Sequence, residues 1–172
     1  MISQLIINNE KTIIIDFLYL DINTCDRCQE TETNLDEALS IFSEVSKCLS
    51  YKVLVNKINV NTKELAEIHR FESSPTIRVN GQDILGAIKE NSCPACSAIS
   101  GQETACRVFE YDGKAFTEPP TAMILEGILS VLFNKNVDKG TVQFVLPQNL
   151  EKFYLTTEKK TEGCSCNGSG CC

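Results

Sequence analysis

The chain has few basic side chains and no long apolar run, and each shortage excludes a class of partner. Its 172 residues include 16 Lys and Arg against 23 Asp and Glu, a formal charge of -7. Basic groups supply much of the affinity for nucleic acid and attract proteins to anionic membrane surfaces. No apolar run approaches the roughly 18 residues that a spanning helix needs. We therefore expect no nucleic-acid partner and no membrane partner.

Several common functional motifs are also missing. The sequence has no tryptophan and a single histidine, His69, and it contains no glycine-rich phosphate loop, no Ser-His-Asp set and no paired-carboxylate motif. Residues 1–10 lack the basic segment followed by an apolar one that a secretory signal shows. These absences indicate a cytoplasmic protein whose chemistry comes from other side chains.

Cysteine, by contrast, is abundant. Nine of the ten cysteines fall into three clusters, and Cys48 stands alone. The clusters are Cys25 with Cys28; Cys93 and Cys96 with Cys106; and Cys164, Cys166, Cys171 and Cys172. Structural disulfides are rare in the reducing cytosol, so thiols at these spacings favour redox or metal chemistry.

The apolar pattern predicts an α/β fold. Residues 13–20 are β-branched, aromatic and nearly all apolar, which is typical of a central strand covered on both faces. Apolar residues between 29 and 49 recur at three- and four-residue steps, which predicts a helix directly after Cys28. Further predicted elements are a strand at 51–60, a short helix capped by Asn61, a hairpin of 76–79 and 82–85 around Asn80-Gly81, and a helix after Pro119-Pro120. That order predicts a small mixed sheet flanked by helices.

Two segments depart from this pattern. Between about 86 and 118 the periodicity breaks down around three cysteines, which predicts an insert with a small strand at 107–111. Residues 156–172 are polar and rich in Lys, Gly and Ser, which predicts a flexible cysteine-rich tail. We therefore expect one domain at 1–155, carrying the insert, and a C-terminal tail at 156–172.

The first cysteine pair suggests a family. Cys25-Asp26-Arg27-Cys28 lies at a helix start and Ser74-Pro75-Thr76 opens a later strand, and this arrangement resembles the thioredoxin superfamily. More narrowly, the chain resembles an uncharacterised bacterial family of thioredoxin-like proteins, with NTCDRC and SSPTIRVNG type segments and a second Cys-x-x-Cys insert, over about residues 10–133. The resemblance implies a thioredoxin-like sheet with an exposed attacking thiol at Cys25 and a resolving thiol at Cys28. It also implies a cis peptide bond before Pro75, with Ser74 offering backbone groups to a bound chain.

Thiol–disulfide exchange is the first functional hypothesis. A helix N-terminus favours the reactive thiolate of Cys25, and Cys28 can resolve the mixed disulfide across its two-residue spacer. This reaction requires no cofactor, and its partners are protein or small-molecule thiols and disulfides. The alternatives for the pair are half of a zinc site or two inert buried thiols.

Soft-ion binding is the competing hypothesis. Cys93, Cys96 and Cys106 can bind zinc if a cysteine of the first motif or the tail supplies a fourth ligand, or bind arsenite as three thiolates. A second redox pair or a local Cys93–Cys96 disulfide stays open as well. The tail thiols, Cys164, Cys166, Cys171 and Cys172, are expected to act as an ion-capturing arm or thiol shuttle, unless the tail holds no site. On this hypothesis the protein binds arsenite, mercury, zinc or copper. A third possibility is an enzyme-associated adaptor protein whose insert binds a structural zinc ion.

Overall fold

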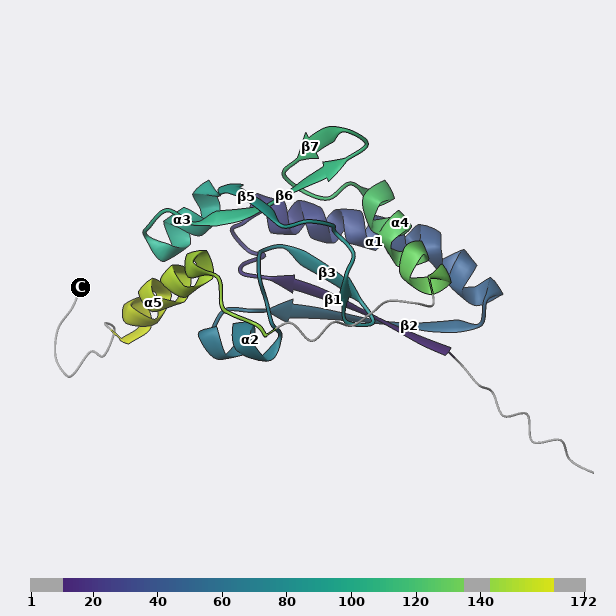
Figure 1. The fold of residues 1–172 in the computed structure, drawn as a ribbon, viewed down its shortest axis with the longest axis horizontal. Helices are drawn as coiled ribbons and strands as arrows, with labels where there is room; N and C mark the ends of the chain where they lie inside the picture. The colour runs from purple at the N-terminus through teal and green to yellow at the C-terminus, as the bar shows by residue number, and fades with distance from the viewer. Residues whose placement is uncertain (1–10, 135–142, 163–172) are drawn as a thin grey trace, which may run out of the picture.

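The structure, a computed structural model, describes residues 11–134 and 143–162 and contains a four-stranded mixed sheet at its centre (Figure 1). The strand order is β2-β1-β3-β4. β1 pairs in parallel with β2 and antiparallel with β3, and β3 pairs antiparallel with β4. The strands are β1 (Lys11–Tyr19), β2 (Tyr51–Asn59), β3 (Thr76–Val79) and β4 (Gln82–Asp83). The prediction of a mixed sheet is therefore confirmed.

Helices cover one face of β1 along its length and the other face only near its C-terminal end, since Ile14 is 41% exposed and Leu18 is buried. The prediction of a strand covered on both faces is therefore only partly correct. On one face, Ile15 and Phe17 pack with α1 (Asp26–Cys48) and α4 (Thr121–Phe133). On the other face, Leu18 joins a second apolar cluster with α2 (Lys63–Ile68) and α5 (Gln148–Glu162). Since burying a large aliphatic or aromatic side chain contributes about 1.5–3 kcal/mol, β1 is the strand around which both cores form.

The insert forms a second, antiparallel sheet beside the first. Its strands are β5 (Lys89–Ser92), β6 (Ala105–Tyr111) and β7 (Lys114–Phe116), in that order. Between β5 and β6 lies α3 (Pro94–Ser100), a helix that the sequence pattern did not predict. Two turns built from small side chains carry too little apolar periodicity to be recognised.

Buried Arg107 anchors the insert to the central sheet. Its backbone N–H donates to the Ser74 carbonyl oxygen at 2.7 Å. Its guanidinium forms an ion pair with Asp83 at 2.6 Å and donates to the Gly86 carbonyl oxygen at 2.6 Å. Arg107 has no exposed surface, so these bonds hold β6 firmly against the β3–β4 hairpin.

Two boundaries differ from the predictions. Helix α2 begins after Thr62, whose side chain accepts from the Leu65 N–H, so the cap lies one residue beyond Asn61. Helix α5 was not predicted, and it continues to Glu162, past the predicted start of the tail at 156, because buried Phe153 and Tyr154 pack it into the core. The four tail cysteines lie outside the described residues. Across residues 11–134 and 143–162, no helix combines the length and apolar character needed to cross a bilayer.

Candidate metal centre

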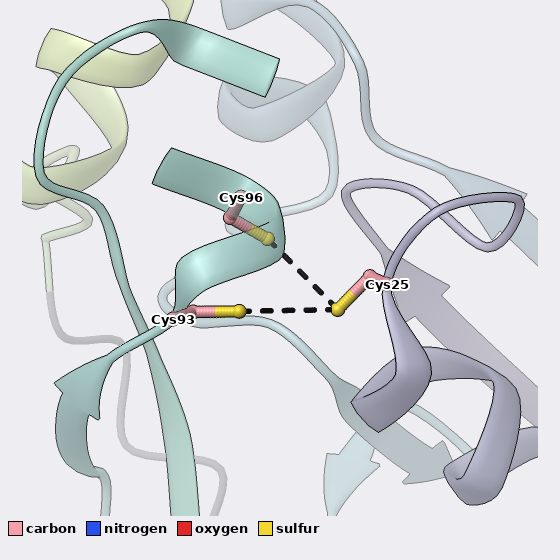
Figure 2. Close-up of side chains that lie close together, drawn as sticks. All are labelled: Cys25, Cys93 and Cys96. Atoms are coloured by element: carbon pink, nitrogen blue, oxygen red, sulfur yellow. Dashed lines mark hydrogen bonds between the residues drawn. The ribbon is translucent and has the colours of Figure 1, made fainter. Parts of the chain in front are cut away.

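Three cysteine sulfur atoms from two distant segments meet at one point (Figure 2). Cys25 Sγ lies 4.0 Å from Cys93 Sγ and 4.0 Å from Cys96 Sγ. All three sulfur atoms lie within 4.8 Å of one another. The structure therefore brings the first Cys-x-x-Cys motif together with the second, an association that the sequence left open.

The helix starts explain how the motifs present their sulfur atoms. Cys25 is the N-cap of α1 and Cys93 is the N-cap of α3, both with extended backbone. In each motif the second cysteine is the third residue of the helix. Each N-cap residue thus lies where extended backbone changes to helix, and its side chain can contact another element there.

Hydrogen bonds hold the second motif in place. The Cys93 N–H donates to the Thr104 carbonyl oxygen at 2.8 Å, which extends the pairing of β5 with β6. The Thr104 N–H donates to Ser97 Oγ at 2.9 Å, and the hydroxyl groups of Thr104 and Ser100 lie 2.8 Å apart. The turn of α3 that carries Cys96 is therefore fixed to the strand that follows it.

Two further cysteines adjoin the three. Cys106 Sγ lies 3.3 Å from Cys96 Sγ, and Cys28 Sγ lies 3.6 Å from the hydroxyl oxygen of Ser74. All five of these cysteines are at most 2% exposed and carry free thiols, whereas Cys48 is exposed. The expectation that Cys25 is exposed is wrong, because the insert covers its sulfur completely.

The contacts between these thiols shift their pKa values in opposite directions. Hydrogen bonding from Cys106, and then from Cys28, Cys93 and Cys96, lowers the pKa of Cys25. Contact with Cys106 likewise lowers the pKa of Cys93, to about 6. Contact with Cys25 raises the pKa of both Cys28 and Cys106. The pKa of Cys96 is raised as well, because contact with Cys106 lowers it but contacts with Cys25 and Cys93 together raise it by more. Thiolate character is therefore concentrated on Cys25 and Cys93.

The spacing of the sulfur atoms suits a metal ion. A zinc–sulfur bond of about 2.3 Å places sulfur ligands about 3.8 Å apart in a tetrahedral site and about 4.0 Å apart in a trigonal planar one. The two separations of 4.0 Å at Cys25 match these values. The cluster of Cys25, Cys93 and Cys96 can therefore hold a metal ion.

The surroundings of Pro75 agree in part with what the thioredoxin resemblance implied. The Ser74–Pro75 peptide bond is cis. However, the carbonyl oxygen of Ser74 already accepts the Arg107 N–H of the insert, and its hydroxyl accepts the Leu20 N–H at 3.1 Å. These groups of Ser74 therefore bind the chain itself, because β6 lies against the residues before β3.

Two arginines near the cysteines were not predicted as part of the site. Arg27, inside the first motif, donates through Nη2 to the carbonyl oxygen of Ser92, at 3.0 Å and next to Cys93. Arg107 follows Cys106 and anchors the insert as described above. The position of Arg27 between two cysteines could have marked it as part of the site. Its bond to the Ser92 carbonyl oxygen, however, depends on the fold.

The fold and the site together define a cysteine-rich α/β domain with a candidate thiolate metal centre. Residues 13–128 match the model of a family described as "Domain of unknown function (DUF2703)", and the chain belongs to this family. The matched region contains the five cysteines that are buried in the described part of the chain. An uncharacterized protein of Archaeoglobus fulgidus is 29% identical over 105 residues, which cover 58% of this chain and 73% of the relative. No solved structure matches the chain.

Proposed function

We propose that the protein binds a soft metal or metalloid ion through Cys25, Cys93 and Cys96. The observation that carries this proposal is the convergence of their three sulfur atoms within 4.8 Å. Thiolates are soft ligands and select ions such as zinc, cadmium, mercury or arsenite. The thioredoxin-like relationship is a separate proposal, and ion binding does not depend on it.

Burial and charge both support ion binding here. The three thiols are at most 2% exposed, so a bound ion loses its water and competing ligands are kept away. The lowered pKa values of Cys25 and Cys93 supply two thiolates near neutral pH, and only a deprotonated thiol is a ligand. Arg27 places its guanidinium on the carbonyl oxygen of Ser92, the residue before Cys93.

Titration of the reduced protein with Cd²⁺ or arsenite, without oxygen, tests this proposal. We use a variant whose four tail cysteines are serine, so that any tight site belongs to the body of the protein. One equivalent of ion should be retained in equilibrium dialysis, with thiolate-to-cadmium absorbance that saturates at that ratio. Retention no greater than that of an unrelated cysteine-free protein contradicts the proposal.

The same titration tests the tail. If Cys164, Cys166, Cys171 and Cys172 capture ions, as the sequence predicts, the unmodified chain should retain more than one equivalent. Equal retention by the unmodified chain and the serine variant removes the tail from the ion-binding function.

Thiol–disulfide exchange is a second candidate function, favoured by the contact of Cys28 with Ser74 beside cis Pro75. In this reaction Cys25 attacks a partner's disulfide and releases one partner thiolate. Cys28 then attacks the mixed disulfide, so that two electrons pass to the partner and a Cys25–Cys28 disulfide remains. Partners would be protein or small-molecule disulfides, and the insert would have to move off Cys25 to admit them.

Insulin reduction in the presence of dithiothreitol tests the second candidate. Cys25→Ser should remove the catalysed part of the rate, because the attacking sulfur is lost. Cys48→Ser, at an exposed thiol remote from the cluster, serves as the matched control and should keep the full rate. An unchanged rate in Cys25→Ser excludes exchange at this pair.

A further inference from the structure

We propose that Cys106 is the fourth ligand of the centre and that the bound ion is a tetrahedral divalent ion of the zinc class. This inference rests on the proposed ion-binding function and specifies its ligand class. The geometry that points to it is the position of Cys106 Sγ, buried and 3.3 Å from Cys96 Sγ.

The pairing of β5 with β6 directs Cys106 toward the other three cysteines. Cys106 of β6 pairs with Asn91 of β5. Two residues away from this pair along each strand, the Cys93 N–H donates to the Thr104 carbonyl oxygen. Residues two apart on a strand share a face, so Cys93 and Cys106 are diagonal neighbours on the same side of the ladder. The ladder thus fixes the fourth sulfur relative to Cys93 before any ion binds.

Cys28 is the competing candidate for fourth ligand, and its contacts argue against it. Its sulfur lies against Ser74 Oγ at 3.6 Å, and within the cluster of three it interacts with Cys25. Cys106 Sγ lies 3.3 Å from Cys96 Sγ and shares a face of the β5–β6 ladder with Cys93. A buried sulfur that contacts one ligand and lies on the same ladder face as another is placed to join them around a bound ion.

Distances and burial also favour four thiolates over three. The observed sulfur separations of 4.0, 4.0 and 3.3 Å lie on both sides of the roughly 3.8 Å expected for tetrahedral zinc. Cys106 lies outside the group whose sulfur atoms are all within 4.8 Å of one another, so its sulfur must move toward the other ligands when the ion binds. The four cysteines are at most 2% exposed, so no open position leads to solvent, as in structural zinc sites with four protein ligands.

Cobalt substitution tests the inference. Co²⁺ is titrated without oxygen into the full chain, with the four tail cysteines as serine, and into the same chain carrying Cys106→Ser. The Cys106→Ser variant should lose about one quarter of the thiolate-to-cobalt charge-transfer intensity and bind Zn²⁺ at least about 100-fold more weakly, because one of four thiolates is gone. Cys48→Ser, which removes an exposed thiol at the other end of α1, is the matched control and should keep both values.

X-ray absorption of the zinc-loaded protein counts the ligands without any substitution. Four sulfur atoms at about 2.3 Å support the inference, and three sulfur atoms with one oxygen or nitrogen overturn it. Unchanged charge-transfer intensity and Zn²⁺ affinity in Cys106→Ser also overturn the inference. In that case, one equivalent of ion bound to the parent chain still supports the proposed ion-binding function. If the parent chain binds no ion, the proposed function itself fails.

Discussion

Serine in place of Cys25 is expected to weaken Cd²⁺ binding at the buried site by at least about 100-fold. Changes to groups outside the ligand set typically cost about 10–100-fold, and loss of a ligand should exceed them. Cys25 is also the one member of the three that comes from α1, whereas Cys93 and Cys96 belong to the insert. Competition of the reduced protein against a chromophoric chelator measures the change in affinity.

A single substitution controls for the loss of a thiol as such. Cys48→Ser removes an exposed cysteine and should retain the affinity of the parent chain. Urea unfolding of each variant without metal shows whether the fold is intact, so a weak site is not confused with an unfolded protein. Full affinity in a folded Cys25→Ser variant would falsify the proposed ligand set.

A bound ion should also stabilise the contact between α1 and the insert. An ion that binds the folded state alone adds RT ln(1 + [L]/Kd) to the free energy of unfolding, about 2.7 kcal/mol at 100 times Kd. This gain should vanish in Cys25→Ser, because the ion can no longer connect the two segments. The thermal midpoint measured with and without Cd²⁺ therefore gives a second, independent measure of the site.

Replacing Arg107 by alanine should lower the free energy of unfolding by about 3 kcal/mol, the lower end of the range for breaking a buried ion pair, because the Asp83 side chain is 29% exposed and stays partly solvated. Arg107 is fully buried and pairs with Asp83 at 2.6 Å, and its donation to the Gly86 carbonyl oxygen is lost as well. Urea unfolding monitored by circular dichroism measures the loss. Because Cys106 precedes Arg107, Cd²⁺ affinity should fall in parallel with stability.

A solvent-exposed pair provides the control. Lys47 and Glu44 lie 2.7 Å apart, with side chains 69% and 76% exposed, so water screens their attraction. Lys47→Ala should leave the unfolding midpoint unchanged. If Arg107→Ala behaves like Lys47→Ala, Arg107 does not anchor the insert, and the position of Cys106 must depend on other contacts.

Local pattern was enough to predict the main elements of the fold. The apolar run of β1, the helical spacing in α1 and the turn at Asn80-Gly81 each carry their structure within a few residues. Helix α3 was missed because it is short and lacks apolar periodicity, and helix α5 was missed because its residues after Leu155 are all polar. Arg107 was missed for another reason: a charged side chain predicts a surface position, and its partner Asp83 is 24 residues away in the sequence.

The sequence by itself determined which chemistry is available, because the number, type and spacing of the thiols belong to the chain. Only the tertiary structure decided which thiols meet. Cys25 and Cys93 are 68 residues apart, and their contact depends on the insert docking through Arg107 onto the central sheet. The local spacing of residues does not predict that docking, because the docking results from burial and hydrogen bonds between segments that are remote in the chain.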